Sequence, residues 1–538
     1  MCMNCGEYKS PSHKLIKFFK KSRDSWEKVA KKRRDEIRDF KARVRDLETS
    51  RNLWKERAKL AVDQVKAKAL ALQNVQKELI KIQIMQVSLQ LECEEFKKKT
   101  PIDHPRGYSY STWIIRMALL LYSSISGLGC RGVMRILTIL NQEGIIAKVP
   151  HWTTVRQWVL KIGYHQIIHG MVKKAKDWGA IFDLTIDIGA LKCLLILGVQ
   201  FSRLKTREDF GLAHSDVLVL GIYFTVSPTG EFVYQSLKNA EKKVGHPFKF
   251  LLSDQGSDVI KGAKIYREDS KKTIVVHDIS HKIANVLEKK LKNDHYWKEF
   301  CEQLTTTKLA VQQTNDLAAL MPPKLRSKAR YMSADVLMNW VSRFQESKKL
   351  GHMNSIAQER FDKYFGWLAV LEPRFEDWKQ MIDIGEIVKE NVRTNGLSRK
   401  TYQNLKDLLK TQFSNPSANV IDFIDVTMNA VWDEVVQLRS GQIVIGDGRV
   451  VESIFGKFKQ SNSSKLQGIT IGALGIATFM ASNEMKDVQK AMEVTTMGQV
   501  IEWSKKHIGN SLASMRRKFF PYKKRNRNEG NSMGAAYT

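Results

Sequence analysis

Residues 181–201 read IFDLTIDIGALKCLLILGVQF, and this stretch decides the fold class. Two runs rich in Ile, Leu and Val flank Gly189, which favours two β-strands, 181–187 and 192–201, joined by a tight turn. The same reasoning predicts strands at 217–226, 248–253 and 273–277, and helices at 231–244, 258–268 and from Ser280 onward. We therefore expect an α/β domain whose first three strands pair as a meander.

The segment before this domain has the composition of helices. From 22 to 99 it lacks Pro and Gly, and apolar residues recur every three or four positions. This pattern predicts one long helix that forms a coiled coil, and hence a homo-oligomer, a dimer or higher. A solvated helical arm folded back on the same chain is the alternative.

Three shorter helices are predicted after the proline-containing linker near 101–105, at 111–122, 129–142 and 153–162. Their arrangement resembles a helix-turn-helix, although a plain helical bundle would give nearly the same pattern. On the helix-turn-helix interpretation, the third helix presents four polar residues to DNA: Thr154, Arg156, Gln157 and Lys161.

The charge of the chain predicts a polyanionic partner. Lys and Arg number 88 against 56 Asp and Glu, a formal net charge of +32. Basic stretches are spread along the whole chain, which favours nucleic acid over a membrane surface. The longest apolar run, 469–481, is too short to span a bilayer.

Six scattered cysteines favour a reducing compartment over a disulfide framework. Cys2 and Cys5 form a lone CxxC pair without the second ligand pair that a zinc site needs. We expect a soluble intracellular protein, cytoplasmic and nucleoid-associated in a bacterium or nuclear in a eukaryote.

Three acidic residues are candidates for metal-dependent chemistry. Asp187 ends the first predicted strand, and Asp254 follows an apolar strand at the edge where α/β proteins place ligands. Glu452 lies on a predicted helix, 450–459, with Arg449 and Lys459 on the same face. Asp183 shares a strand face with Asp187 and is its rival; we prefer Asp187 because it lies next to the turn.

These residues resemble the Asp-Asp-Glu triad of DDE transposases with a ribonuclease H-like catalytic domain. The nearly all-helical stretch before Glu452 resembles the insertion of hAT-type and several bacterial insertion-sequence transposases. Asp278-Ile279-Ser280-His281 matches the [C/D]xxH motif that those families carry after the fifth strand. Arg449, Glu452 and Lys459 partly match the signature of another insertion-sequence group, whose arginine is one residue further away and whose tyrosine is missing here.

The residue patterns and the resemblance, which covers roughly 108–479 and leaves the coiled coil and the tail unexplained, together predict a multidomain α+β protein. Its expected parts are an N-terminal segment (1–21), a coiled-coil helix (22–99), a helix-turn-helix domain (108–165), a ribonuclease H-like catalytic domain in two parts (178–286 and 441–485), an all-helical insertion between them (287–440), and a C-terminal helix with a basic tail (486–538). The basic tail, 516–527, is expected to lack fixed structure, and 469–485 is expected to form one helix.

The resemblance also implies an activity. Asp187, Asp254 and Glu452 would hold two Mg²⁺ or Mn²⁺ ions, with His281 near the scissile phosphate or a displaced base. The enzyme would bind transposon ends, cleave them, and join the 3′ ends to target DNA. Arg449 and Lys459 would contact DNA. The alternatives are a catalytically inactive, transposase-derived regulator that binds a specific DNA sequence, and a ribonuclease H-like nuclease such as a junction resolvase, which is usually smaller.

Overall fold

The computed structural model divides into two units, Met1–Ile102 and Asp103–Thr538, and each is considered by itself. The described residues are 14, 16–34, 36, 41, 51, 104–170, 172–186, 191–204, 207, 209–314, 316–325, 334–351, 353, 356, 358–461 and 468–520. In the first unit, residues 16–34 are helical, as predicted for the part from 22 onward. The apolar stripe on which the coiled-coil prediction depends lies outside the described residues.

The second unit contains a five-stranded mixed sheet. Its strands are β1 Trp178–Ile186, β2 Lys192–Gln200, β3 Val217–Thr225, β4 Phe250–Ser253 and β5 Ile274–His277. They lie in the order β3-β2-β1-β4-β5. β1, β2 and β3 pair antiparallel, while β4 and β5 run parallel to β1. The predicted α/β domain and its three-stranded meander are therefore confirmed, with strand ends shifted by at most three residues.

Side chains of β1 alternate between the two faces of the sheet, as predicted. Ala180 and Phe182 are buried against α6 (Gly230–Val244) and α7 (Ser257–Asp269), which cover one face. Ile181 points to the other face, where it belongs to the main core. This alternation fixes the face on which the next odd-numbered residue, Asp183, lies.

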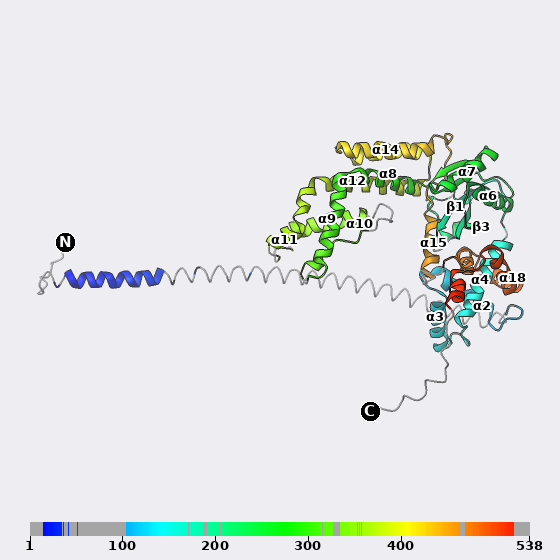
Figure 1. The fold of residues 1–538 in the computed structure, drawn as a ribbon, viewed down its shortest axis with the longest axis horizontal. Helices are drawn as coiled ribbons and strands as arrows, with labels where there is room; N and C mark the ends of the chain where they lie inside the picture. The colour runs from blue at the N-terminus through cyan, green and yellow to red at the C-terminus, as the bar shows by residue number, and fades with distance from the viewer. Residues whose placement is uncertain are drawn as a thin grey trace, which may run out of the picture. The chain divides into compact units, whose positions relative to one another are not determined.

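Helices from both ends of the second unit pack around one another beside that other face, with α4 against β3 (Figure 1). They are α2 Thr112–Ser124, α3 Cys130–Gln142, α4 Trp152–His169, α16 Leu474–Thr478, α17 Met485–Val494, α18 Met497–His507 and α19 Leu512–Phe519. The buried apolar side chains of α2, α3, α4, α16, α17 and α18 belong to one core cluster, whereas no described side chain of α19 is buried. The three helices predicted at 108–165 are therefore present, but they share this core with the C-terminal helices and do not form a core of their own.

The contact between α4 and α16 is close. A Cβ added at Gly163 would lie 2.0 Å from the carbonyl oxygen of Leu474, and the Thr478 hydroxyl donates to the carbonyl of Val159 at 2.9 Å. Only glycine at position 163 lets the two backbones approach this far. The helix that the sequence suggested for DNA recognition is thus a central packing helix on most of its faces.

Two C-terminal predictions are wrong. Residues 469–485 do not form one helix: a 3₁₀ turn, Ile471–Ala473, leads into α16, and α17 begins only at Met485. The break has a local cause, since the Ser482 hydroxyl accepts a hydrogen bond from the Glu484 amide and competes with helical bonding. The beginning of the basic tail is also ordered, because Arg516 lies within α19.

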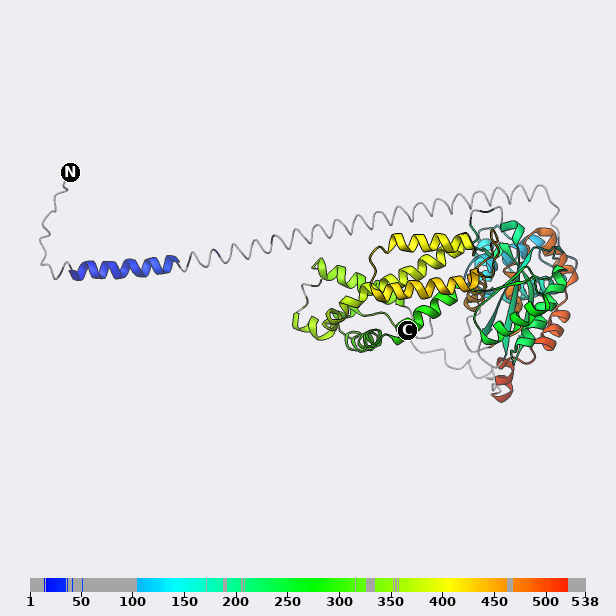
Figure 2. The same cartoon turned by 90° about the horizontal axis from the view of Figure 1, so that it is seen from above.

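The segment from α8 to α14 is helical throughout its described residues, apart from turns, as predicted. Its helices are α8 Ile279–Asn293, α9 His295–Val311, α10 Ala334–Lys349, α11 Gln358–Phe365, α12 Trp367–Asn395, α13 Arg399–Gln412 and α14 Ala418–Val435. α8, α12 and α14 contact one another and run side by side (Figures 1 and 2). Within the described part of the chain, no helix is long and apolar enough to cross a membrane.

A buried ion pair ties the end of α14 to the sheet. The Glu434 carboxylate accepts hydrogen bonds from the His277 backbone N–H (3.0 Å), the Lys282 ammonium (2.8 Å) and the His277 ring Nδ1 (3.0 Å). Burial raises the pKa of Glu434, but the hydrogen bonds from His277 and Lys282 lower it more, so the pKa lies below its usual value. Gln437 adds a bond to the carbonyl of Val275 at 2.7 Å.

We predict that Glu434→Ala lowers the free energy of unfolding by about 3 kcal/mol at neutral pH, because it leaves Lys282 buried without its main partner. Urea denaturation measures the change. Asp433→Ala is the matched control: Asp433 also faces Lys282, at 3.7 Å, but its side chain is 71% exposed, and its loss should cost less than about 1 kcal/mol. Equal losses in the two variants would contradict the assignment.

The same pair has a defined pH dependence. Because the pKa of Glu434 is lowered by folding, its stabilising contribution is present above the unfolded-state pKa of about 4.3 and is lost as pH falls through the lower folded-state value. The stability difference between wild type and Glu434→Gln should therefore shrink on acidification below about pH 4. A difference that stays constant down to the acid-unfolding limit would contradict it.

Candidate functional site

Asp183 lies on β1, and Asp254 comes directly after β4, the neighbouring parallel strand. Phe182 of β1 pairs with Ser253, the last residue of β4. Asp183 and Asp254 are the residues that follow this pair in the sequence. Both are half-buried and line one small pocket. Asp183 accepts a hydrogen bond from the Leu184 amide at 2.7 Å. The register of the sheet therefore brings two carboxylates together.

Asp254 is held by the turn that leads into α7. Its Oδ1 accepts the Gly256 backbone N–H at 3.1 Å, and Gly256 is the N-cap of α7 without any side chain to offer. Asp254 lies two residues before this cap and is not part of the helix. Its carboxylate faces the pocket beyond the end of β4, as the sequence suggested.

Glu452 reaches the same pocket from α15, which spans Arg449–Ser461 and packs on β1. It lies in the first turn of α15, and its Oε1 is 3.0 Å from Nε2 of His281 in the first turn of α8. The side chains are 36% and 28% exposed, so the pair stands at the pocket opening. The structure thus brings together Asp254, Glu452 and His281, three of the four residues predicted to be catalytic.

Asp278 positions both helices. Its buried carboxylate accepts the N–H groups of Ser280 (2.7 Å) and His281 (3.3 Å), which caps α8, and of Gly448 (2.8 Å), which precedes α15. The amide of Ile279 adds a bond to the carbonyl of Gly446 at 3.0 Å. A Cβ at position 448 would lie 2.6 Å from the Asp278 carboxylate, so a larger residue there would displace this carboxylate. Asp278 is therefore a positioning residue for both His281 and Glu452.

The electrostatics of the pocket are dominated by carboxylates. Burial, together with the negative charge of Asp183, raises the pKa of the Cys193 thiol on β2. Carboxylate oxygens of this kind are the ligands that Mg²⁺ and Mn²⁺ prefer. Among the residues that the structure describes, no three His, Cys, Asp or Glu side chains lie close enough to form a ready-made metal cluster.

Asp187 lies outside the described residues and stays a sequence prediction. Its rival, Asp183, is the carboxylate of β1 that lines the pocket. Sequence reasoning preferred the strand end next to the turn. β4, however, ends opposite Phe182, in the middle of β1, and only the register between strands distant in sequence gives this information.

The two cations predicted beside Glu452 differ in their surroundings. Arg449 is held in an ion-pair network, with its Nε 2.7 Å from Asp447 and its terminal nitrogen 3.6 Å from Glu390 of α12. Through these ion pairs, the guanidinium of Arg449 holds the start of α15 to α12. Lys459, in the last turn of α15, is exposed.

The four residues predicted to contact DNA from α4 also separate into two kinds. Arg156 and Gln157 are exposed, and Thr154 is half-buried. Lys161 donates to the Tyr108 hydroxyl at 2.5 Å, and partial burial lowers the pKa of its ammonium. DNA contact therefore stays a prediction for Arg156, Gln157 and Thr154, whereas Lys161 is engaged inside the protein.

In the sequence, Asp278 stands out only as the first residue of the DxxH motif, and nothing local indicates that it holds the start of α15. A buried aspartate at a helix N-cap is detectable from its position, but its bond to Gly448 joins residues 170 positions apart, and no local pattern predicts such a contact.

A comparison of the chain with protein-family models and with curated proteins found no match in either.

We predict that Asp278→Ala lowers the free energy of unfolding by about 2 kcal/mol, because it removes an N-cap and leaves the buried Gly448 amide without an acceptor. Thermal or urea unfolding measures the loss. The matched control is Asp258→Ala: Asp258 lies in the first turn of α7 but accepts no hydrogen bond from a described residue. If both substitutions cost the same, Asp278 has no special role.

Proposed function

We propose that this chain is a DNA transposase of the DDE type, with Asp183, Asp254 and Glu452 as its catalytic carboxylates. One observation carries the proposal. Carboxylates from β1, from the end of β4 and from α15 line one pocket, although α15 begins far downstream in the sequence. We assign to Asp183 the role that the resemblance gave to Asp187, because the register of β1 with β4 brings Asp183 beside Asp254.

The topology supports a ribonuclease H-like catalytic domain. A sheet in the order β3-β2-β1-β4-β5, with three antiparallel strands followed by two parallel ones, is what the sequence resemblance leads one to expect. On this proposal the helical segment between α8 and α14 is the insertion, and α15 returns the chain to β1.

Asp183, Asp254 and Glu452 offer only carboxylate oxygens, which fit two Mg²⁺ or Mn²⁺ ions. Such ions supply activation of the attacking oxygen and stabilisation of the leaving oxygen in phosphodiester cleavage. His281 contributes through its hydrogen bond to Glu452, which fixes the direction of that carboxylate. Asp278 holds His281 and the start of α15 in register with the sheet.

The partner is DNA, both the ends of the element and the target. The net charge of +32 supports a polyanionic partner, and Arg156 and Gln157 on α4 remain exposed for contact. A homo-oligomer would bring the two ends of the element together. This part of the proposal rests on the coiled-coil prediction for 22–99. Arg449 is assigned to positioning α15, since its partners are Asp447 and Glu390.

The test is a cleavage and strand-transfer assay with Mg²⁺ on DNA that carries the sequences flanking the gene. We expect Asp183→Asn, Asp254→Asn and Glu452→Gln each to reduce cleavage by at least about a thousandfold while DNA binding persists, because the carboxylates are needed for the reaction and not for binding. Removal of the metal with EDTA should have the same effect on the wild type.

Asp258→Asn is the matched control, because Asp258 lies close to Asp254 in sequence but outside the pocket lining. Asp187→Asn compares the two candidates for the first carboxylate. Cleavage lost with Asp187→Asn and retained with Asp183→Asn would overturn the assignment of Asp183. A wild-type protein that binds these ends but never cuts them would favour the transposase-derived regulator.

A further inference from the structure

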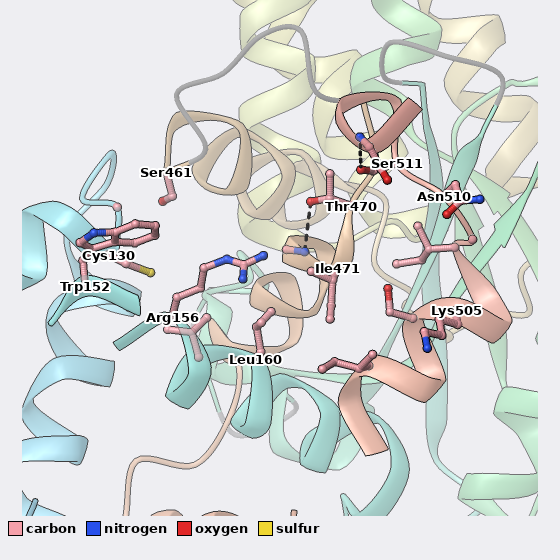
Figure 3. A pocket seen from close by; sticks show the side chains of 18 of the residues that line it. Cys130, Trp152, Arg156, Leu160, Ser461, Thr470, Ile471, Lys505, Asn510 and Ser511 are labelled. Carbon is pink, nitrogen blue, oxygen red and sulfur yellow. Dashed lines mark hydrogen bonds between the residues drawn. The ribbon is translucent and has the colours of Figure 1, made fainter. Parts of the chain in front are cut away.

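A second cavity, of about 660 Å³, lies between α3, α4, the end of α15, α18 and α19 (Figure 3). It has no lining residue in common with the carboxylate pocket. Trp152 and Cys130 stand on one side of it, and Lys505, Asn510 and Ser511 on the other. The cavity is therefore built by segments that are far apart in the sequence, and the C-terminal helices supply one complete wall.

Four cationic side chains line this cavity: Arg131 of α3, Arg156 of α4, Lys505 of α18 and Arg517 of α19. All four residues are exposed, so the cavity opens to solvent. Its described lining contains no Asp or Glu. None of the four makes a salt bridge with a described carboxylate, in contrast to Arg449. No described carboxylate compensates their mutual repulsion, which favours an anionic ligand.

The rest of the lining suits phosphate oxygens. The guanidinium of Arg131 lies 4.7 Å from the ring centroid of Trp152, which holds this charge at the cavity wall. The first turn of α3 also lines the cavity, and its N-cap, Gly129, has no side chain to cap the helix. Hydroxyl groups of Ser461, Ser504 and Ser514 add hydrogen-bonding capacity.

We propose that this cavity binds the phosphate backbone of DNA, independently of base sequence and away from the carboxylate pocket. The inference rests on the proposed function and adds a second contact site to it. A helix-turn-helix alone would use the exposed edge of α4. The cavity instead groups Arg156 with Lys505 and Arg517, so the C-terminal helices α18 and α19 take part in holding DNA.

The experiment measures binding of the full chain to a labelled duplex of arbitrary sequence by fluorescence anisotropy over a range of salt concentrations. Arg131→Gln and Lys505→Gln should each weaken binding to unrelated sequences alike. Each should reduce the slope of log K against log salt by about 1, and the double variant by about 2. Thermal unfolding checks that these exposed substitutions leave the fold intact.

The chain offers matched controls. Arg135 is exposed on the same helix as Arg131, and Lys506 is exposed next to Lys505, but neither lines the cavity. Arg135→Gln and Lys506→Gln should leave affinity and salt slope close to wild type. Because each control removes the same charge from the same helix, a general effect of net charge would change it equally.

Three outcomes overturn the inference. If the wild type binds duplex DNA and the cavity variants match their controls, the cavity is not a DNA site, while the proposed function stands. If the wild type does not bind DNA even at low salt, both fail. If the wild type binds inorganic phosphate, and Arg131→Gln loses this binding while keeping wild-type affinity for DNA, the cavity is a site for a small phosphate compound and not for DNA.

Discussion

The arrangement of the site depends on the backbone hydrogen bonds that the carboxylate of Asp278 accepts. Asp278 is 3% exposed and accepts three backbone N–H groups from two segments, the start of α8 and the loop before α15. A buried charge without partners would be costly, but these donors and the positive end of the α8 dipole stabilise it. The same bonds fix where α15 begins relative to α8, and so bring Glu452 within 3.0 Å of His281.

This junction also explains how a long helical segment can separate two parts of one site. The entropy of closing a loop grows only slowly with its length, so what matters is that the two ends meet securely. Asp278 joins the start of α8 to the loop before α15. The buried pair of Glu434 with His277 and Lys282 adds a second connection, from the end of α14 to β5 and α8. His277 and Asp278 are consecutive, so both connections converge on the end of a single strand.

The sequence predicted the strands well, because alternation and apolar content are local properties. It also selected Asp254 and Glu452, which line one pocket in the structure. It does not show that Asp183 lies beside Asp254, since this depends on the register between β1 and β4. The contact of α4 with α16 through Gly163 was equally beyond reach, and it explains why the segment 108–165 lacks a core of its own.

Composition alone does not identify which cations act on a ligand. Arg449 was a candidate because it lies on the same helix face as Glu452, yet Asp447 and Glu390 engage it, and Lys161 on α4 is engaged by Tyr108. Arg131 and Lys505 belong to no recognisable motif, yet they converge on one cavity without a described carboxylate. A paired cation is largely neutralised by its partner, whereas converging unpaired cations favour an external anion. The distribution of ion pairs therefore separates cations that hold the fold from those available to a ligand.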